Sequence, residues 1–182
     1  MIEIDVPGKV VLAGEYSVLL PGTPCLVAAV DRTLVLRARR AARWSVRSGD
    51  VSWNAGEPPP EALRFLTAAI EAVRLKVPVP AYEVETFDTM HDGDRKLGLG
   101  GSAASVVAGT WLAAHGSALD DATRWEIADE VHRREQGGRG SGADVAASVH
   151  GGVVRYWREP RRAWPVRVHP DVRLLLAWTG AA

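Results

Sequence analysis

Two glycine-rich segments contain the residues of this chain that are best suited to binding an anion. The segment KLGLGGSAAS covers residues 96–105, and the segment GGRGSGADVAAS covers residues 137–148. A run that we expect to be helical follows each glycine cluster. The first turn of a helix leaves backbone N–H groups unpaired and carries partial positive charge, so a bare backbone there can close around a phosphate. The alternative is a glycine-rich turn that only permits tight packing.

The first segment has the composition that a phosphate-binding loop needs. Glycine occupies three of the four positions before its serine: Gly98, Gly100 and Gly101. Ser102 adds a hydroxyl at the expected helix start, and the small side chains of Ala103 and Ala104 let a bulky ligand lie close. We therefore predict that residues 98–104 curl around the phosphates of a ligand.

Three known motifs fit this segment less well. Gly98-x-Gly100-x-x-Ala103 matches a relaxed dinucleotide-binding fingerprint, but a polar loop precedes it where that fingerprint has a strand. A P-loop needs Gly-Lys-Ser/Thr, and the lysine is missing. Gly100-x-Ser102-x-Ala104 loosely resembles the nucleophile elbow of a hydrolase, which also needs a histidine. The sequence gives no distinctive setting to the four candidates His115, His132, His150 and His169.

Asp144 and Lys9 are candidates for proton transfer and charge stabilisation. Asp144 ends the second glycine cluster, where a carboxylate beside a phosphate can orient a hydroxyl and accept its proton. Lys9 follows Pro7-Gly8, where a lysine can point into a cleft, keep a nearby carboxylate ionised and stabilise phosphoryl charge. The alternatives are that Asp144 only caps the following helix and that Lys9 is a solvated lysine at a strand edge.

The elements that position these residues are expected to form an α+β domain. Apolar and acidic residues alternate at 2–6, Pro7-Gly8 interrupts the pattern, and a second β-type run starts at Lys9 and bends at Gly14. Further strands are expected at residues 25–38, 44–53, 77–87, 153–157 and 172–178. Helices are expected at residues 61–75, 102–116, 121–135 and 145–152, and residues 88–95 are expected to form a polar loop. Strands, then helices, then strands favour a layered α+β fold over regular βαβ repetition.

Composition limits the class of protein. The 182 residues are 47% hydrophobic and 24% charged, as in a soluble globular protein, and they suffice for one domain. The 22 basic and 22 acidic side chains cancel, so no overall field draws the chain to nucleic acid or to an anionic membrane. The sequence has no signal-peptide pattern, no apolar run near 18 residues and one cysteine, Cys25. We expect a cytoplasmic protein with no nucleic-acid or membrane partner.

Three segments, in this order, resemble the N-terminal part of the GHMP small-molecule kinases. They are PGKVVLAGEYSVLLPGTPCLV at 7–27, KLGLGGSAAS at 96–105 and GRGSGADVAASVHGG at 138–152, and the resemblance extends over residues 5–180. The stretch AGEY followed by PG, together with GSGADVAAS, looks most like the phosphomevalonate kinase and mevalonate kinase branch. The GEHTDYN of galactokinases and the KYWGK of the related decarboxylases are missing.

This resemblance implies a fold, a reaction and roles for named residues. The fold would be the α+β layered fold of ribosomal protein S5 domain 2, with a mixed or antiparallel sheet packed on helices. ATP and Mg²⁺ would be the cofactors of a kinase that phosphorylates a small alcohol or phosphorylated alcohol, phosphomevalonate or mevalonate, in isoprenoid precursor synthesis. Lys9 and Asp144 would be catalytic. The implied nucleotide-binding residues are Lys96, Gly98, Leu99, Gly100, Gly101, Ser102, Ala103 and Ala104. The implied acceptor-binding residues are Glu15, Tyr16, Arg139, Ser141 and Gly142.

Two departures from the family pattern concern the metal and the serine pair. The family motif has paired serines, and here Gly101 replaces the first, which is tolerable if backbone N–H groups do most of the binding. The mevalonate kinase branch has a metal-binding glutamate at the position of Arg133. Ser102 and the nearby Glu135 are then the implied metal ligands. From charge alone, Arg133, Arg134 or Arg139 is expected to bind an anionic group of the acceptor.

The resemblance also implies that the family has two domains, of which this chain would form one. Residues 1–182 would form the N-terminal ATP-binding domain, and the second domain of the family, with its third glycine-rich motif, would be absent from this chain. We therefore expect weak turnover from these residues alone, and a homodimer or a separate chain as a partner. The alternatives are one half of a two-chain kinase and a non-catalytic binding or regulatory module on the same fold.

Overall fold

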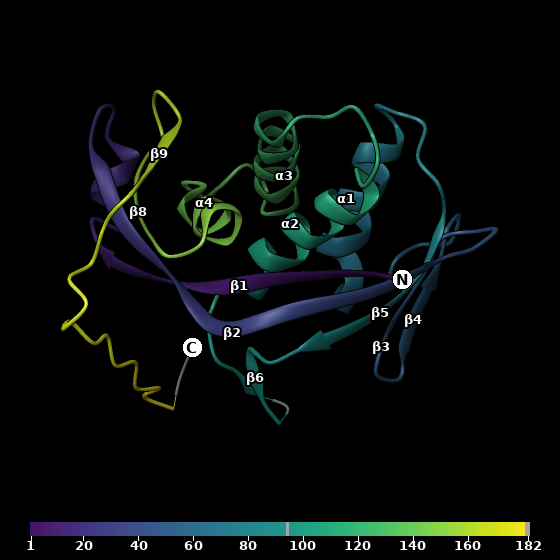
Figure 1. The fold of residues 1–182 in the computed structure, drawn as a ribbon, viewed down its shortest axis with the longest axis horizontal. Helices are drawn as coiled ribbons and strands as arrows, with labels where there is room; N and C mark the ends of the chain where they lie inside the picture. The colour runs from purple at the N-terminus through teal and green to yellow at the C-terminus, as the bar shows by residue number, and fades with distance from the viewer. Residues whose placement is uncertain (94, 181–182) are drawn as a thin grey trace.

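The structure, a computed structural model, describes residues 1–93 and 95–180 and shows a mixed sheet with helices on one face (Figure 1). The strands of the sheet are β1 (Ile2–Ala13), β2 (Pro24–Arg40), β3 (Ser45–Ser48), β4 (Val51–Asn54), β5 (Tyr82–Asp88), β8 (Val153–Trp157) and β9 (Arg162–Pro165). A separate hairpin consists of β6 (His91–Asp92) and β7 (Arg95–Lys96). The helices are α1 (Arg64–Arg74), α2 (Gly101–Ala113), α3 (Asp121–Glu135) and α4 (Ala143–His150). Short 3-10 turns occur at Ser17–Leu19 and Glu61–Leu63.

The long strand β2 organises the sheet. It pairs antiparallel with β1 over most of its length, with β5 along residues 34–40, and with β8 along residues 24–28. Because β3 runs parallel to β5, the sheet is mixed. The expected α+β layered fold, a mixed sheet packed on helices, is confirmed.

The break that we expected at Pro7-Gly8 is a register shift inside one continuous strand. β1 runs from Ile2 to Ala13, and its pairing with β2 shifts between Pro7 and Lys9. Gly8 is required at this irregularity because a Cβ there would lie 2.6 Å from the carbonyl oxygen of Leu99 and 2.7 Å from Met90 Sδ. The missing side chain therefore lets the first glycine-rich segment pack directly against β1.

The helices form a layer in which α2 is central. α2 is buried along most of its length, and its small residues allow close packing against α1. A Cβ at Gly109 would lie 2.7 Å from the carbonyl oxygen of Leu66 in α1. A second core cluster fills the space between α4 and the sheet; it consists of Val18, Cys25, Val27, Ala143, Ala146, Ala147, Val154 and Tyr156. The tight packing of α2 and α4 fixes where their N-termini lie.

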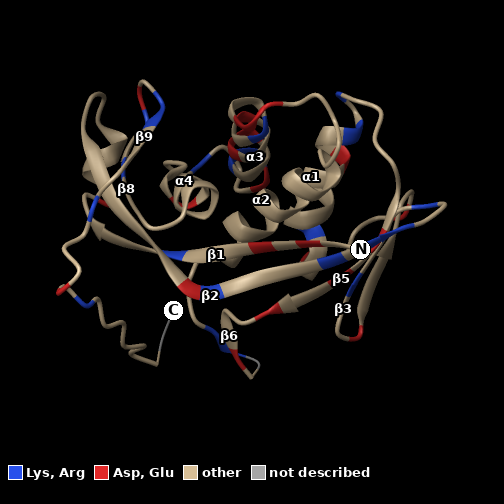
Figure 2. Cartoon of the chain, in the orientation of Figure 1, with Lys and Arg blue, Asp and Glu red and all other residues tan. Residues whose placement is uncertain are grey.

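Charges of both signs are distributed over the whole molecule, without a broad face of one sign in this view (Figure 2). Several pair across the sheet, such as Arg37 with Glu3 at 2.9 Å and Arg39 with Glu83 at 2.9 Å. Among residues 1–93 and 95–180, no helix combines the length and the apolar character needed to cross a bilayer.

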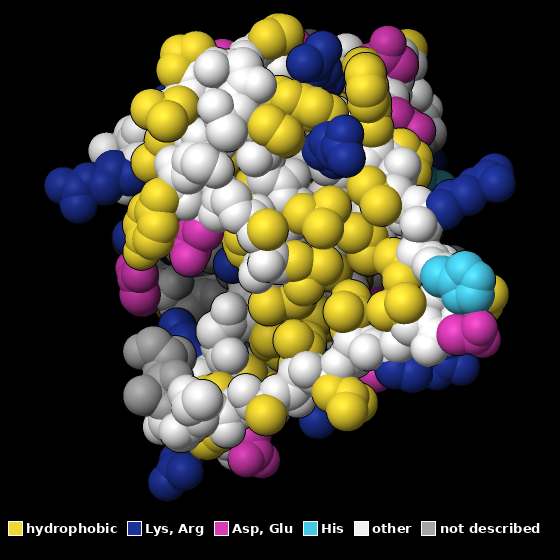
Figure 3. Space-filling model, turned by 90° about the vertical axis from the view of Figure 1, so that its left-hand side faces the viewer, with side chains coloured by type: hydrophobic (Ala, Val, Ile, Leu, Met, Phe, Trp, Pro, Cys, Tyr) yellow, Lys and Arg dark blue, Asp and Glu magenta, His cyan; other side chains and the backbone are white. Residues whose placement is uncertain are grey.

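One end of the molecule carries many exposed apolar side chains. This apolar end, on the left of Figure 1, is formed by the end of β1, the turn after it, the β8–β9 hairpin and residues 166–180. Viewed from that side, hydrophobic side chains gather across the centre (Figure 3). The large ones with substantial exposure are Leu12, Leu19, Leu20, Trp164, Val168, Val172, Leu174, Leu175, Leu176 and Trp178.

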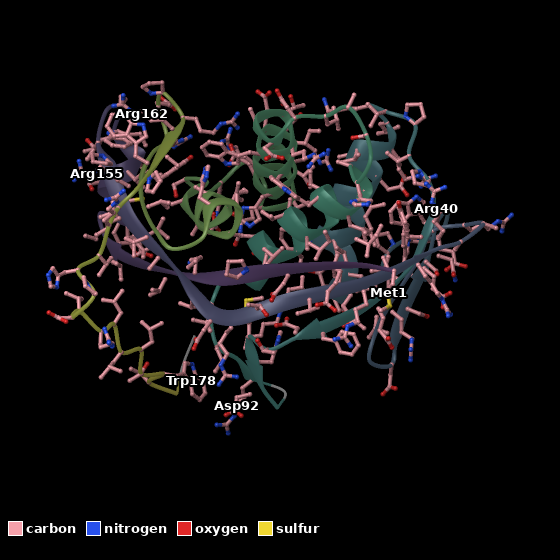
Figure 4. The ribbon with its side chains drawn as sticks, viewed as in Figure 1. Met1, Arg40, Asp92, Arg155, Arg162 and Trp178 are labelled. Atoms are coloured by element: carbon pink, nitrogen blue, oxygen red, sulfur yellow. The ribbon has the colours of Figure 1, made fainter. Side chains whose placement is uncertain are left out.

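Three expectations about secondary structure were wrong. Residues 44–53 form the β3–β4 hairpin and not one strand, because Gly49 adopts a φ of 56° and turns the chain. The polar loop at 88–95 contains part of the β6–β7 hairpin. Residues 172–178 are not a strand, because no other segment of the described chain pairs with them. Trp178 instead lies near the β6–β7 hairpin (Figure 4), with Arg95 Cζ 6.0 Å from its ring centroid.

Candidate functional site

The first glycine-rich segment forms an open start for α2. Gly98 and Gly100 have φ values of 73° and 82°, which a residue with a side chain rarely adopts. Gly100 is the N-cap of α2, and within the described residues no side chain caps this end. The backbone N–H of Lys9 donates to the carbonyl of Leu99 at 2.7 Å and holds the segment against β1. The first N–H groups of α2 are therefore available to an anion.

The Lys9 side chain lies across this helix start. A Cβ at Gly100 would be 2.9 Å from Lys9 Cγ and 3.0 Å from Lys9 Cε, so the aliphatic part of the lysine occupies the space that the glycine leaves. Lys9 is half-buried, unlike a solvated lysine at a strand edge. The structure therefore places its positive charge near the N-terminus of α2, where it adds to the partial charge of the helix.

The second glycine-rich segment packs tightly against buried polar side chains. Gly142, the N-cap of α4, has a φ of 84°, and a Cβ there would lie 2.4 Å from Asp129 Oδ1 and 2.7 Å from the Tyr156 hydroxyl. That hydroxyl donates to the carbonyl of Ser141 at 2.8 Å. Asp129 is buried and pairs with Arg133 at 2.7 Å and with Arg161 at 3.3 Å. The position of this segment is thus fixed by buried polar groups.

Both segments are attached to the same irregular part of β1. On α4, Ser148 Oγ donates to the carbonyl of Pro7 at 2.9 Å, one residue before Gly8. Asp144 lies in the first turn of α4, where its Oδ1 accepts from the N–H of Val145 at 3.0 Å. Two segments about 40 positions apart in the sequence therefore start their helices beside one another.

His132 connects the two helix starts, and the sequence analysis did not single it out as a site residue. Its Nε2 lies 3.1 Å from Ser102 Oγ and 3.7 Å from Asp144 Oδ2. The side chain of Gln136 contacts the same nitrogen at 3.3 Å. His132 is only 2% exposed, and burial lowers its pKa, as does the charge of Lys9, whereas Asp144 and Asp129 act in the opposite direction. Ser102, Asp144 and Lys9 thus all interact with the buried imidazole of His132.

A signal for His132 exists in the sequence. Ile127, Ala128 and Val131 form the buried face of α3, and His132 continues this face. A polar residue beside these apolar positions needs a partner when it is buried, so its position predicts a polar contact in the interior. The sequence does not identify that partner, because Ser102 and Asp144 belong to other helices.

Three of the predicted acceptor residues lie just before α4 in the chain. Ser141 and Gly142 precede this helix, and Arg139 is exposed just before them. Glu15 and Tyr16 are exposed in the turn after β1, close to Val18, which packs in the same core cluster as Ala143. Of the expected anion-binding arginines, Arg133 pairs with Asp129 and Arg134 pairs with Glu135. Within the described residues, Arg139 makes no ion pair.

The predicted site residues Lys96 and Glu135 take no part in the contacts described above. Lys96 is exposed on β7 in the small hairpin, while Leu99 contributes its backbone to the contact with β1. Glu135 Oε2 lies 3.8 Å from Arg64 Nε, and its Oε1 lies 3.2 Å from Arg134 Nε. In the described part of the chain, no three His, Cys, Asp or Glu side chains gather as a metal-binding group.

Two hollows of the surface lie elsewhere. One of about 600 Å³ lies between the loop after β4 and α1, lined in part by Trp53, Pro58 and Glu71. Another of about 490 Å³ lies over the sheet near Arg37 and Arg47. Neither is lined by a residue of the two glycine-rich segments, so neither belongs to this site.

Comparisons with known proteins agree with this geometry. The family model described as the N-terminal domain of the GHMP kinases matches residues 64–152, which include both glycine-rich segments. The phosphomevalonate kinase of Streptomyces sp. (strain CL190) is 32% identical over 96% of this chain and 55% of its own length. The mevalonate kinase of Aeropyrum pernix is 31% identical over 96% of this chain and 56% of its own length.

The chain belongs to the GHMP kinase family. It spans about half the length of the curated relatives that it matches. Solved structures share its fold. The Lin0012 protein of Listeria innocua has a TM-score of 0.75 at 26% identity, over 85% of this chain and 48% of its own. Streptococcus pneumoniae phosphomevalonate kinase, in complex with phosphomevalonate and AMPPNP, has a TM-score of 0.72 at 23% identity, over 86% of this chain and 50% of its own.

Proposed function

We propose that residues 1–182 form the ATP-binding part of a GHMP kinase that transfers the γ-phosphoryl group of ATP to a small alcohol or phosphorylated alcohol, mevalonate or phosphomevalonate. The observation that carries the proposal is the contact of one imidazole nitrogen with both Ser102 and Asp144. This contact requires the two glycine-rich helix starts to face a common space. A phosphate-binding loop and a proton acceptor are then within reach of one reacting group.

The start of α2 fits a nucleotide. Its N-cap is a glycine in the left-handed region, and a Cβ at Gly101 would have its nearest neighbours at 3.9 and 4.0 Å, so a ligand can approach the backbone here. The N–H groups of residues 101–103 would bind the phosphates, and the ammonium of Lys9 would lie against them. Mg²⁺ bound with ATP would neutralise phosphate charge, with Ser102 as its proposed protein ligand.

The metal role of Glu135 stays a prediction. Its carboxylate would have to leave Arg64 and Arg134 to reach an ion beside Ser102. Magnesium in kinases keeps several water ligands and needs only one or two protein groups besides phosphates, so Ser102 with a single carboxylate would suffice.

Asp144 is the proposed proton acceptor. Its carboxylate lies in the first turn of α4, where the helix dipole favours a negative charge. Where the acceptor is an alcohol, its hydroxyl oxygen would attack the γ-phosphorus, the bond from that phosphorus to the bridging oxygen of ADP would break, and the hydroxyl proton would pass to Asp144. Lys9 would offset the charge that accumulates on the transferring group.

The acceptor would lie beside the start of α4. Ser141 and Gly142 offer backbone groups there, and Glu15 and Tyr16, exposed in the turn after β1, are proposed as further contacts of the acceptor. Arg139 is the proposed contact for the anionic group of the acceptor, because Arg133 and Arg134 are engaged by acidic side chains. Phosphomevalonate and mevalonate both carry a carboxylate, and the names of the relatives support these two substrates.

A partner is proposed for the apolar end. The exposed side chains of Leu12, Leu20 and Leu175 lie on a face whose apolar character is typical of an interface (Figure 3). A second copy of the chain or the second domain of the GHMP family would cover it. We expect the phosphoryl-transfer rate of residues 1–182 to be low until such a partner is added, because an open site admits water.

Calorimetric titration with AMPPNP and Mg²⁺ tests the nucleotide site directly. The expected result is saturable binding by the wild-type chain that Ser102→Ala weakens. The matched control is Ser105→Ala, because Ser105 Oγ donates to the carbonyl of Gly101 within the same helix. Phosphoryl transfer to mevalonate and to phosphomevalonate is then measured with the second domain added. Binding without transfer in every combination would favour a non-catalytic module, and absence of binding would exclude the kinase proposal.

A further inference from the structure

His132 lies between the two glycine-rich segments without a role in the reaction described above. It contacts Ser102, the proposed ligand of the nucleotide complex, and approaches Asp144, the proposed proton acceptor. The ring is held in place by burial and by the ring of Phe65, whose centroid lies 5.7 Å away. A polar side chain with this degree of burial needs a hydrogen-bond partner, and its partners here are residues of the site.

Two groups that can donate, the amide nitrogen of Gln136 at 3.3 Å and Ser102 Oγ at 3.1 Å, face the ring nitrogen Nε2 of His132. With the Gln136 amide in this orientation, Nε2 is the acceptor and the neutral ring carries its proton on Nδ1. The two donors share the single lone pair of Nε2, and Ser102 Oγ is the nearer of them. Both lone pairs of Ser102 Oγ are left for other partners.

We propose that His132 is a positioning residue that accepts the hydroxyl proton of Ser102 and so directs the lone pairs of this oxygen toward the phosphates and metal ion of the nucleotide. The inference rests on the proposed kinase function and adds a residue that acts through Ser102. A serine hydroxyl that binds a cation must give its proton to another acceptor, and the buried imidazole is an acceptor fixed in place.

The same geometry leaves Asp144 free. An unprotonated Nε2 does not donate to Asp144, and the distance of 3.7 Å to Oδ2 exceeds that of a hydrogen bond. His132 and Asp144 therefore do not form a charge-relay pair. Asp144 Oδ2 thus stays available to accept the proton of the acceptor alcohol, while Oδ1 accepts from the N–H of Val145.

The contact itself is tested by nuclear magnetic resonance on the unliganded protein. Long-range ¹⁵N–¹H correlation spectra of the histidine rings distinguish a protonated Nδ1 from a protonated Nε2. We expect the Nδ1–H form for His132, and we expect the Nε2 signal to shift in Ser102→Ala but not in Ser105→Ala. A protonated Nε2, or an unchanged signal in Ser102→Ala, would overturn the proposal without reference to nucleotide.

Two substitutions of His132 separate positioning from packing. Glutamine places its terminal amide near the position of Nε2, whereas asparagine reaches only as far as Nδ1. We expect His132→Asn to weaken the binding of AMPPNP with Mg²⁺ about three- to tenfold, in line with the loss of one hydrogen bond, and His132→Gln to restore most of the affinity. Adding His132→Asn to Ser102→Ala should weaken binding no further, because both remove the same interaction.

Thermal unfolding of each variant shows whether the fold is retained. His150→Gln is the control, since His150 is an exposed histidine at the C-terminal end of α4 that packs on Trp125 in α3. Wild-type affinity in folded His132→Asn would overturn the role of His132 alone, and so would additive losses in the double variant. A wild-type chain that binds no nucleotide would instead overturn the kinase proposal together with this role.

Discussion

The N-terminus of α3 differs from the N-termini of α2 and α4. α3 begins with Asp120, whose side chain accepts from the N–H of Thr123 at 2.8 Å, and Asp121 follows in the first turn. α2 and α4 begin instead with Gly100 and Gly142, both in the left-handed region, and in the part of the chain that the structure describes no side chain caps either helix.

This difference distinguishes a helix N-terminus that only stabilises the fold from one that can bind an anion. A capping carboxylate occupies the N–H groups that an anion would otherwise use, and its negative charge repels a phosphate. A glycine cap gives up that stabilisation, and at α2 it leaves the first N–H groups accessible. At α4 the N–H groups of Ala143 and Val145 donate to Ser141 Oγ and Asp144 Oδ1, so α2 is the anion-binding start and α4 presents the carboxylate. Five substitutions test the comparison, from the largest expected effect to the smallest.

Asp144→Asn would test whether the start of α4 performs chemistry. The asparagine keeps an oxygen for the N–H of Val145 but cannot take a proton from the acceptor alcohol. We expect the phosphoryl-transfer rate, measured with the second domain present, to fall by roughly 10²–10⁴-fold, while the affinity for AMPPNP stays the same. A rate within a few-fold of wild type would leave Asp144 as a helix-capping residue only.

Gly142→Ala would test whether the tight packing beneath this segment requires glycine. The added Cβ would collide with Asp129 Oδ1 and the Tyr156 hydroxyl at a φ of 84°. We expect a loss of about 3 kcal/mol in the free energy of unfolding, measured in urea. Gly116→Ala is the control: its φ is 73° but no atom lies within 4 Å of the added Cβ, so about 1 kcal/mol is expected. Equal losses would mean that only backbone strain matters.

Gly100→Ala would test the open start of α2. The alanine strains the backbone at a φ of 82° and pushes the flexible Lys9 side chain aside. We expect a loss of about 1 kcal/mol in stability and roughly a tenfold weaker affinity for AMPPNP with Mg²⁺, because the loop and the lysine both shift. Titration calorimetry measures the affinity, and unchanged binding would contradict the proposed phosphate site.

Asp120→Ala would remove the conventional cap of α3. We expect the free energy of unfolding to fall by about 1 kcal/mol, in denaturant titration, because the N–H of Thr123 loses its partner. Nucleotide affinity should not change, since Asp120 lies at the opposite end of α3 from His132 and is not one of the site residues. A weaker affinity would mean that α3 as a whole moves when its start frays.

Gly101→Ser would restore the serine pair of the family motif. The nearest atoms to a Cβ there are Met90 Cε at 3.9 Å and Asp88 Oδ2 at 4.0 Å, so the side chain fits without rearrangement. We expect a stability change within about 0.5 kcal/mol and wild-type or slightly tighter nucleotide binding. A strong loss of affinity would show that the ligand uses the space that Gly101 leaves open.

Much of the fold was predictable because it follows local patterns. The apolar positions of α1 recur at helical spacing and are buried as expected, from Leu66 to Ile70 and Val73. The Asp120 cap of α3 was predictable from the sequence as well. The strand at 172–178 was not, because strand formation depends on a partner and not on the segment alone.

The candidate site was predictable in its parts only. The glycines, Ser102, Asp144 and Lys9 are recognisable by type and order, and their roles remain predictions. His132 was missed, since its importance depends on which helices pack against α3. The expected metal role of Glu135 could not be judged from spacing, because its ion pair with Arg64 joins residues far apart in the chain.

The sequence by itself determined where helices can begin without a side-chain cap, because the conformation of Gly100 and Gly142 is a local property of residues without a Cβ. Only the tertiary structure decided that these two starts share one space. That arrangement depends on the register shift at Gly8, on the contact of Ser148 with Pro7, and on the burial of His132 between them. Each of these contacts joins residues distant in sequence, and their geometry is set by the packing of the sheet against the helices.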